Sequence, residues 1–154
     1  MNFSGVEKFE YSQEYVWLAM HNSNLLQNTI PGCTSLEPQE NGEYLVSLEL
    51  GIAAIKGKYE GTAKIVDLET PKNYELYAEG SGKPGFVKIK MDCVFEAIDT
   101  NECTMSWETE LEAGGLIASI GGRVLSGIAK HLAKQFFKSV RKELSQYEEL
   151  KFTY

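Results

Sequence analysis

Two histidines and three cysteines are the residues of this chain best suited by type to acid–base catalysis or metal binding. A nucleophile–base pair most often uses a histidine, and a zinc site uses histidines and cysteines at short spacing. His21 falls at the end of a predicted helix and His131 beside a run of lysines, where we expect surface or helix-terminal roles. Cys33, Cys93 and Cys103 are odd in number and widely spaced, without a CxxC pair. This pattern predicts reduced thiols, with neither a disulfide framework nor a zinc site.

The other polar residues show no arrangement that demands catalysis. The carboxylates fall mainly on outward positions of predicted strands, and neither a P-loop nor a dinucleotide fingerprint is present. The stretch Gly80–Gly82 is not a phosphate loop, because no helix is predicted to begin after it. We therefore expect no catalytic residues, no metal site and no covalently bound cofactor.

Composition narrows the class of protein further. The 154 residues, 43% of them hydrophobic and 24% charged, predict a single domain over residues 1–154 with a sizeable core. A net charge of −7 and a pI of 4.9 argue against a protein that tracks nucleic-acid phosphates. Neither a signal peptide nor an apolar run of roughly 20 residues is visible. We expect a cytoplasmic protein without a transmembrane segment.

The N-terminal part of the chain predicts one strand followed by two short helices. The strand covers residues 2–11, and the helices cover about 13–21 and 24–29. Ser12 is a suitable N-cap for the first helix, because its hydroxyl can accept a bond from an early amide. Pro31-Gly32 ends the helical part.

The middle of the chain alternates between apolar and polar residues, which is typical of strands with one solvated face. Such strands are predicted at about 44–50, 58–65, 74–80, 87–96 and 105–111. Short turns connect them, so an antiparallel meander is expected.

From about Gly114 to Tyr147 the apolar period changes to that of a helix. Its apolar positions are Ile117, Ile120, Val124, Ile128, Leu132, Phe136, Val140 and Leu144. A single helix of this length would extend on the order of 50 Å. The predicted fold class is therefore α+β, a curved antiparallel sheet of about six to seven strands around a long C-terminal helix.

Small residues occupy inward positions of two predicted strands, namely Gly61 with Ala63 and Ala78 with Gly80. One interpretation is that they let the helix pack tightly on a curved sheet. The other is that they leave space for an apolar guest. Glycines recur in the first half of the predicted helix, Gly114–Gly127, which we expect to form a movable wall, whereas Ala129–Tyr147 should anchor the helix. The anchoring residues are predicted to be Leu132, Phe136, Val140 and Leu144.

A ligand cavity between sheet and helix would be lined by large apolar side chains around the small ones. The predicted lining consists of Trp17, Leu48, Tyr59, Gly61, Ala63, Leu76, Ala78, Ile89, Met91, Phe95, Met105, Trp107, Ile117, Ile120, Gly121 and Val124.

The predicted helix also carries a basic stripe. Lys130, Lys134 and Lys138 are four residues apart and share one face. The favoured interpretation is a solvated face that compensates the acidic sheet. The alternative is a docking surface for an acidic partner or an anionic membrane.

Several segments together resemble the family of the carbon monoxide dehydrogenase G subunit. They are Glu14–Ala19, Leu25-Leu26, Ile30–Leu36, Lys58–Gly61, Pro71–Tyr74, Gly80–Phe86 and Ile120–Leu125. The resemblance covers nearly the whole chain and is most distinctive at Ile30–Cys33. It implies the START-related helix-grip fold, in which a curved sheet grips a long C-terminal helix around an apolar cavity.

The resemblance also implies an accessory role beside a molybdenum hydroxylase of the CO dehydrogenase type. Members of the family are thought to recruit the enzyme to the membrane by handling a quinone or similar lipid. Many members carry a C-terminal membrane anchor, and this chain stops at Tyr154 without one, so at most a peripheral contact with the inner face of the membrane is expected.

Three hypotheses follow for the function. The leading one is a non-enzymatic carrier or adaptor that binds a lipid or quinone-like molecule between sheet and helix. The second is an enzyme of the cyclase or hydrolase type that uses the same cavity. The third is a protein-interaction module that uses the basic stripe.

Overall fold

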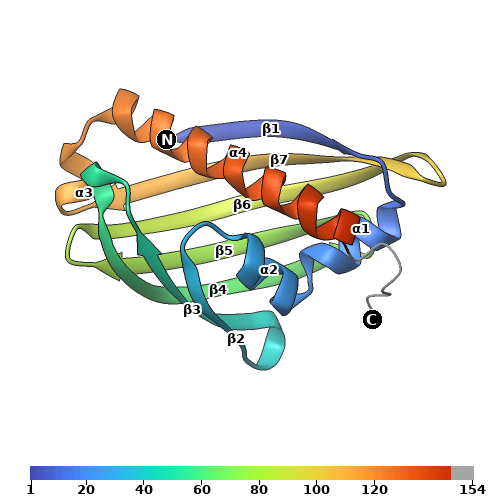
Figure 1. Cartoon of the computed structure of the whole chain (residues 1–154), viewed down its shortest axis with the longest axis horizontal. Helices are drawn as coiled ribbons and strands as arrows, with labels where there is room; N and C mark the ends of the chain where they lie inside the picture. Colours follow the sequence, from blue (N-terminus) through green and yellow to red (C-terminus); the bar gives the residue numbers. More distant parts are fainter. Residues whose placement is uncertain (147–154) are drawn as a thin grey trace.

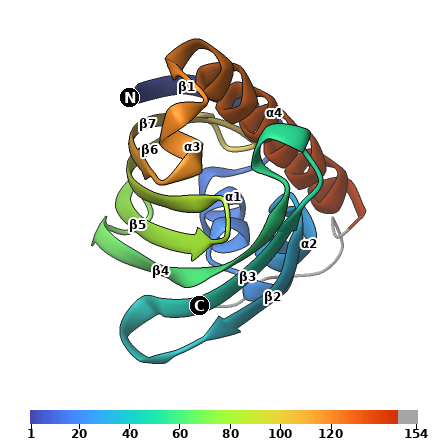
Figure 2. The ribbon, with the colours of Figure 1, turned by 90° about the vertical axis from the view of Figure 1, so that its left-hand side faces the viewer.

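The computed structural model describes residues 1–146. Its strands form one seven-stranded antiparallel sheet in the order β1-β7-β6-β5-β4-β3-β2, which curls around helix α4 (Figures 1 and 2). The strands are β1 (Asn2–Phe9), β2 (Cys33–Pro38), β3 (Glu43–Leu50), β4 (Gly57–Glu69), β5 (Asn73–Gly82), β6 (Gly85–Asp99) and β7 (Glu102–Gly114). The helices are α1 (Gln13–Met20), α2 (Ser23–Thr29), α3 (Leu116–Ser119) and α4 (Gly122–Gln146), with 3-10 turns η1 (Glu40–Gly42) and η2 (Ala53–Ile55). The predicted α+β helix-grip fold is confirmed.

Helices α1 and α2 begin at side-chain caps. The hydroxyl of Ser12 accepts a hydrogen bond from the amide of Tyr15 at 3.2 Å, as predicted. Asn22 caps α2 by accepting from the amide of Leu25 at 2.9 Å. Asn22 therefore starts the second helix, because its short side chain satisfies an amide that lacks an intrahelical partner.

The C-terminal region differs from the single long helix that was predicted. Gly114 is the last residue of β7, and the four-residue α3 is separated from α4 by a break at Gly121. Gly115 and Gly121 have φ angles of +69° and +96°, which interrupt a right-handed helix and favour glycine. The 25 residues of α4 give a length of about 38 Å, shorter than expected. Tyr147, the predicted helix end, lies outside the described residues.

Helix α4 is anchored mainly by its C-terminal half, as expected, but through a partly different set of residues. Phe137, Val140 and Leu144 are buried, whereas Leu132 and Phe136, which we also predicted as anchors, are only half-buried. The helix contacts α2 and β1. Arg141 supports the contact with β1 by donating to the carboxylate of Glu7 at 3.0 Å.

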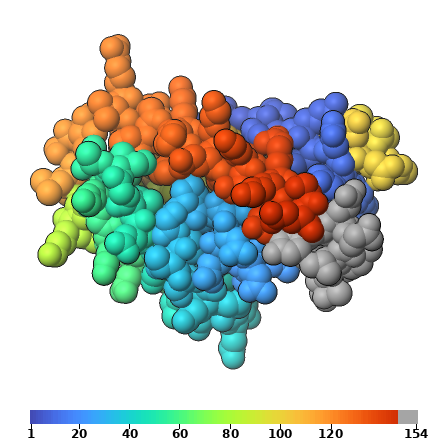
Figure 3. Space-filling model, in the orientation of Figure 1, coloured from blue at the N-terminus to red at the C-terminus, as the bar shows by residue number. Residues whose placement is uncertain are grey.

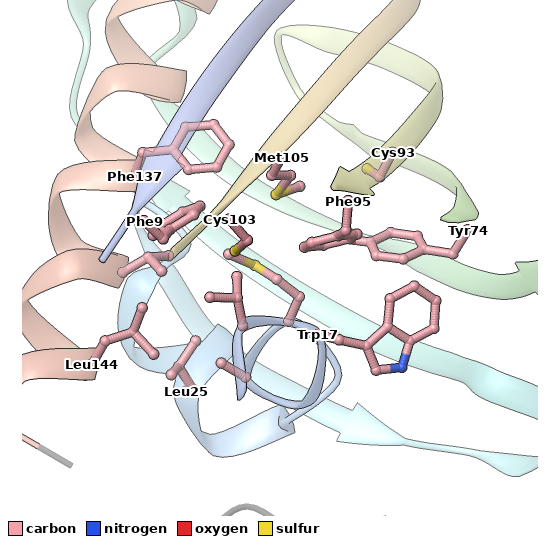
Figure 4. Packing of buried hydrophobic residues seen from close by; sticks show 14 residues of the cluster. Phe9, Trp17, Leu25, Tyr74, Cys93, Phe95, Cys103, Met105, Phe137 and Leu144 are labelled. Atoms are coloured by element: carbon pink, nitrogen blue, oxygen red, sulfur yellow. The ribbon is translucent and has the colours of Figure 1, made fainter. Parts of the chain in front are cut away.

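The buried side chains form two separate core clusters. The first lies between α1, α2, the sheet and the end of α4, and comprises Phe9, Val16, Trp17, Ala19, Met20, Leu25, Tyr74, Cys93, Phe95, Cys103, Met105, Phe137, Val140 and Leu144 (Figure 4). The second lies at the opposite end and comprises Ile55, Tyr59, Ile117 and Leu125. Each end of α4 is thus held by a different cluster.

Gly61 of β4 and Gly80 of β5 lie directly opposite each other, yet only Gly61 needs to be glycine. A Cβ atom on Gly61 would collide with the carbonyl oxygen of Glu79, whereas a Cβ atom on Gly80 would have its nearest neighbour, the carbonyl oxygen of Glu60, at 3.7 Å. Gly61 therefore serves the close approach of two strands in a curled sheet.

We expect Gly61→Ala to lower the free energy of unfolding by about 1–3 kcal/mol, because the strands must move apart. Gly80→Ala should be neutral or raise it by up to about 1 kcal/mol, because alanine costs less entropy to fix in a strand. Urea denaturation of both variants measures the difference. Equal effects would contradict the assignment of the close approach to Gly61.

Candidate functional site

The strand register places the small residues in one block on the inner face of the sheet, the face turned toward α4. Gly61 pairs with Gly80, and Ala63 pairs with Ala78. Strands β3, β6 and β7 continue these rows, mostly with larger side chains. The rows are Val46–Gly61–Gly80–Val87–Ala113 and Tyr44–Ala63–Ala78–Ile89–Leu111. The inner face thus carries a shallow patch in β4 and β5, bordered by Tyr44 and Val46 of β3 and by Val87 and Ile89 of β6.

Exposure along the inner face changes from its ends to its middle. The ends are buried, with Tyr59 in the second core cluster and Phe95 and Met105 in the first. The middle is only half-buried although it faces α4. The half-buried residues are Val46, Leu48, Gly61, Ala63, Ile65, Leu76, Ala78, Gly80, Val87, Ile89, Met91, Thr109 and Leu111. The middle of this face is therefore less closely covered by protein than its two ends.

Helix α4 shows the same change on the side that faces the sheet. Leu125 near its start and Phe137 toward its end are buried, whereas Ile128 and Leu132 between them are half-buried. Both walls are thus incompletely packed at the same level. We take this region, between the two core clusters, as the candidate ligand site.

The residues predicted to line a cavity fall into three groups. In the middle of the inner face lie Gly61, Ala63, Ala78 and Ile89, all half-buried. Leu76, Met91 and Trp107 are also half-buried but pack against the first core cluster, and half-buried Leu48 packs against the second. In the core clusters lie Trp17, Phe95 and Met105 (first) and Tyr59 and Ile117 (second), with half-buried Ile120 packed against the second. Gly121 and Val124 are exposed, Val124 by 52%. The structure thus places these last two outside the walls, because the helix break turns the start of α4 so that Leu125 faces inward. Ligand contact of the others stays a prediction.

Several residues of the same inner surface were not among the predicted lining. They are Val46, Val87, Thr109, Leu111, Ile128 and Leu132. The sequence could have indicated them, because each has the strand parity or the helical spacing of a residue that was predicted to line the cavity.

Trp107 separates the candidate site from strand β1. Its indole covers Gly5, where any side chain would collide with the ring, and stacks on Phe137 with ring centroids 6.1 Å apart. Its Nε1 atom is buried without a hydrogen-bond partner in the described part of the chain.

Titratable groups gather where the inner face meets the first core cluster. Tyr74 is buried, and burial together with its contact to Cys93 raises its pKa well above the usual value. Burial, together with nearby Asp67, also raises the pKa of Tyr44. These hydroxyls are therefore neutral over the physiological range.

His21, the C-cap of α1, is engaged on both ring nitrogens. Nδ1 lies 2.7 Å from the carbonyl oxygen of Trp17 and must donate to it, because a carbonyl only accepts. Nε2 lies 2.7 Å from a carboxylate oxygen of Asp67, and the ring stacks on Trp17 at 4.5 Å. His21 thus joins the end of α1 to β4.

The buried thiols make the free energy of unfolding depend on alkaline pH. Burial raises the pKa of Cys93 to about 12 and that of Cys103 to about 11. The folded protein therefore keeps protons that the unfolded chain, with an ordinary thiol value of 9.0, releases earlier. Stability should be complete below about pH 9 and fall as the pH rises toward 12, by up to about 1.4 kcal/mol per pH unit for Cys93.

Urea denaturation between pH 8 and 11 checks this slope. Cys93→Ala should flatten it, and Cys33→Ala, at a half-buried position, should leave most of it. An unchanged slope in Cys93→Ala would refute the link to this thiol.

The structure has an open groove of about 670 Å³ on the outer face of the sheet, lined mainly by Thr62, Lys64, Tyr77, Glu79, Lys88 and Lys90. Its lining also reaches Ala63, Ala78, Ile89 and Leu111 of the inner-face rows. Its charges alternate in sign, since Lys88 lies between Glu79 and Glu112 in the ladder. Such a surface is well solvated, so we do not assign the apolar ligand to it. The sequence indicated these residues only as outward strand positions.

The basic stripe of Lys130, Lys134 and Lys138 is exposed on α4, so its docking role stays a prediction. Within residues 1–146, no three histidine, cysteine or acidic side chains gather closely enough to hold a metal ion. None of the helices described there has the length and hydropathy to cross a membrane.

Comparison with known proteins identifies relatives of the whole chain. The model of the family described as the G subunit of carbon monoxide dehydrogenase (CoxG) matches residues 5–145. A conserved protein from Geobacillus kaustophilus of solved structure is 34% identical, with 96% of this chain and 97% of that chain covered and a TM-score of 0.91. No curated protein shows a significant match.

Two more distant solved structures share the fold. A START superfamily protein from Mycobacterium smegmatis has a TM-score of 0.72 at 7% identity, covering 94% of this chain and 97% of that chain. The Zhui aromatase/cyclase from Streptomyces sp. R1128 has a TM-score of 0.70 at 8% identity, covering 96% and 94%.

Proposed function

This chain belongs to the CoxG family, that of the carbon monoxide dehydrogenase G subunit, and on that premise we propose that it is a carrier for an apolar small molecule of the lipid or quinone kind. The ligand lies between the inner face of the sheet and α4. The carrier has no catalytic role of its own.

The half-buried middle of both walls supports this proposal. The small block of Gly61, Ala63, Ala78 and Gly80 leaves the sheet shallow where it faces α4, and the core clusters close the region at each end. A ligand lying there touches aliphatic side chains and methionine, which suits an apolar chain better than a polar molecule.

The length of the apolar chain should govern affinity. Each buried methylene contributes about 0.8 kcal/mol, so two further methylenes strengthen binding by roughly tenfold. The gain ends where the chain reaches one of the core clusters.

Native mass spectrometry of the purified protein, followed by solvent extraction, tests whether it carries such a molecule. A fluorescent fatty acyl probe, displaced by fatty acids of increasing length and by a soluble quinone, measures the affinity. We expect a bound apolar ligand and an affinity that rises with chain length to a plateau. Absence of any ligand, together with no probe binding, would sink the proposal.

The partner of this carrier is a molybdenum hydroxylase of the CO dehydrogenase type, as the family name suggests. Pull-down of such a hydroxylase by the carrier tests this step. Charge reversal of Lys130, Lys134 and Lys138 in the same assay tests whether the basic stripe forms the contact. Loss of capture with unchanged probe affinity assigns the stripe to the partner.

A cyclase- or hydrolase-type enzyme acting in the same space is the second candidate. Tyr44 and Asp67 favour it, because they share the inner parity of Ala63 and lie near the candidate site. Against it, His21 uses both ring nitrogens within the protein, so its imidazole has no free nitrogen to act as a base. Turnover of a long-chain p-nitrophenyl ester by the wild type, lost in Asp67→Asn, would replace the carrier proposal by an enzyme.

A further inference from the structure

The described walls of the candidate site offer no cation to a bound ligand. Between Lys8 and Lys56 the sequence contains neither lysine nor arginine, so α1, α2, β2 and β3 bring none to the site. Within residues 1–146, the inner positions of β4 to β7 also hold neither of these residue types. Arg123, Lys130 and Lys134 of α4 are exposed. A negatively charged head group would therefore lose its hydration without gaining a counter-charge.

Polar groups meet the inner face of the sheet at Tyr44 and Asp67. Tyr44 of β3 continues the central row of Ala63 and Ala78 and is half-buried. Asp67 has the same inner parity on β4, where it lies opposite Tyr74. Its negative charge is close enough to contribute to the raised pKa of Tyr44. The hydroxyl and the carboxylate therefore lie near each other, beside the apolar middle of the site.

His21 holds the Asp67 carboxylate from the side of α1. Its Nε2 atom lies 2.7 Å from Oδ1 of Asp67, while Nδ1 donates to the carbonyl oxygen of Trp17. The His21 ring stacks on Trp17 and meets Tyr74 edge-on, with ring centroids 4.5 and 5.1 Å apart. A carboxylate held in this way is pre-organised, so it loses little conformational entropy when it binds a further group.

One oxygen of Asp67 and the hydroxyl of Tyr44 remain available to a ligand. Among the hydrogen bonds of the described residues, none involves Oδ2 of Asp67 or the hydroxyl of Tyr44. The Asp67 side chain is 43% exposed, so water reaches it at the edge of the site. An ionised carboxylate only accepts hydrogen bonds, whereas a tyrosine hydroxyl can donate one. The pair therefore matches a hydroxyl group, which donates and accepts at the same atom.

Helix α4 covers the candidate site on the side opposite the sheet. It contacts α2, and its Leu125 shares the second core cluster with Ile55 of η2. Figure 3 shows the surface of α4 lying directly against the surfaces of α2 and of the η2 segment. An apolar chain beneath α4 is thus shielded from water, whereas a head group beside Asp67 stays in contact with it. This arrangement orients an amphiphile with its tail inward and its head at Asp67.

We propose that the ligand of the carrier is an amphiphile with an uncharged, hydroxyl-bearing head, which donates to Oδ2 of Asp67 and accepts from the hydroxyl of Tyr44. This inference rests on the proposed carrier function and narrows its ligand class. Long-chain alcohols and phenols fit the site. Fatty acids fit it less well, because their carboxylate would lie beside Asp67 with no cation near it.

Displacement of the fluorescent fatty acyl probe by three ligands built on the same dodecyl chain tests this head site. The ligands are the alcohol, its methyl ether and the carboxylic acid, at about pH 8, where the free acid is ionised. The alcohol should displace the probe at a concentration at least about tenfold lower than either of the others, because only its head donates a hydrogen bond to a carboxylate. Equal affinities for the alcohol and the ether, or the tightest binding for the acid, would overturn the proposal.

Two site variants and one matched control locate the head site. Tyr44→Phe and Asp67→Leu should each reduce the advantage of the alcohol over the ether to less than about threefold, because each removes one of the two hydrogen bonds. Asp67→Leu should also strengthen binding of the acid, because it removes the like charge. Glu79→Leu makes the same kind of change on the exposed, outer side of β5 and should keep the full advantage. Retention of the advantage in either folded site variant, or its loss in Glu79→Leu, would exclude the assignment.

Circular dichroism melts show which variants are folded. Tyr44→Phe keeps the contact between His21 and Asp67, so it tests the head site even if Asp67→Leu fails to fold. Probe binding itself separates this inference from the carrier function. A protein that binds the probe but does not distinguish the three heads refutes only the head site, whereas a protein that binds neither the probe nor any of the three ligands refutes the carrier function.

Discussion

Replacing Ala78 by phenylalanine should abolish binding of the fatty acyl probe, with a loss of at least about a hundredfold in affinity. Ala78 lies on the inner face between Ala63 and Ile89, in the half-buried middle of the sheet. A phenyl ring there occupies the space that we assign to the ligand. Because Ala78 is half-buried and belongs to neither core cluster, the variant should lose less than about 1 kcal/mol of unfolding free energy.

Probe affinity and unfolding free energy together decide whether the small residues serve ligand binding or the packing of helix on sheet. Thr62→Phe places the same ring on the exposed, outer side of β4 and should leave probe affinity unchanged. If Ala78→Phe is instead destabilised by several kcal/mol, the small residues serve packing and the region holds no ligand. Unaltered probe binding in a stable Ala78→Phe protein would move the ligand elsewhere.

Replacing Trp17 by alanine should lower the free energy of unfolding by about 3–5 kcal/mol. Trp17 is 2% exposed and meets Tyr74 and Phe95 edge-on, with ring centroids 5.4 and 5.5 Å apart. In Figure 4 its indole lies beside both rings. The loss is a large part of the roughly 5–15 kcal/mol available to a domain of this size.

Urea denaturation followed by circular dichroism measures this loss without relying on tryptophan fluorescence. Trp17→Phe keeps a ring and should recover more than half of the lost free energy. Val6→Ala, at a 66% exposed position of β1, should change it by no more than about 0.5 kcal/mol. A small effect of Trp17→Ala would mean that the first core cluster is not the main source of stability.

The alternation of apolar residues was sufficient to predict the inner face of the sheet. Tyr59, Gly61 and Ala63 share a parity in the sequence and a face in the structure. The pairing of Gly61 with Gly80 was not predictable in this way, because register depends on where each hairpin turns. The collision at Glu79 that requires Gly61 depends on how strongly the sheet curls.

The apolar period correctly predicted a C-terminal helix, but it chose the wrong neighbour at two positions of its buried face. At Val124-Leu125 and Phe136-Phe137 both neighbours are apolar, so periodicity alone does not decide which one faces the sheet. The break at Gly121, with its positive φ, sets the start of α4 and hence the orientation of these pairs. The presence of a ligand between sheet and helix stays a prediction, since small inward residues serve both packing and binding.

The separation of the two core clusters affects how this protein can diverge. The aromatic-rich first cluster, around Trp17 and Phe95, is far larger than the second, around Ile117 and Leu125. Ala63 and Ala78 themselves belong to neither cluster, so substitutions at these two positions should disturb neither of them. Natural selection can therefore remodel the shape of the ligand site in many small steps while thermostability stays nearly constant. Specificity and robustness can evolve independently in such a scaffold.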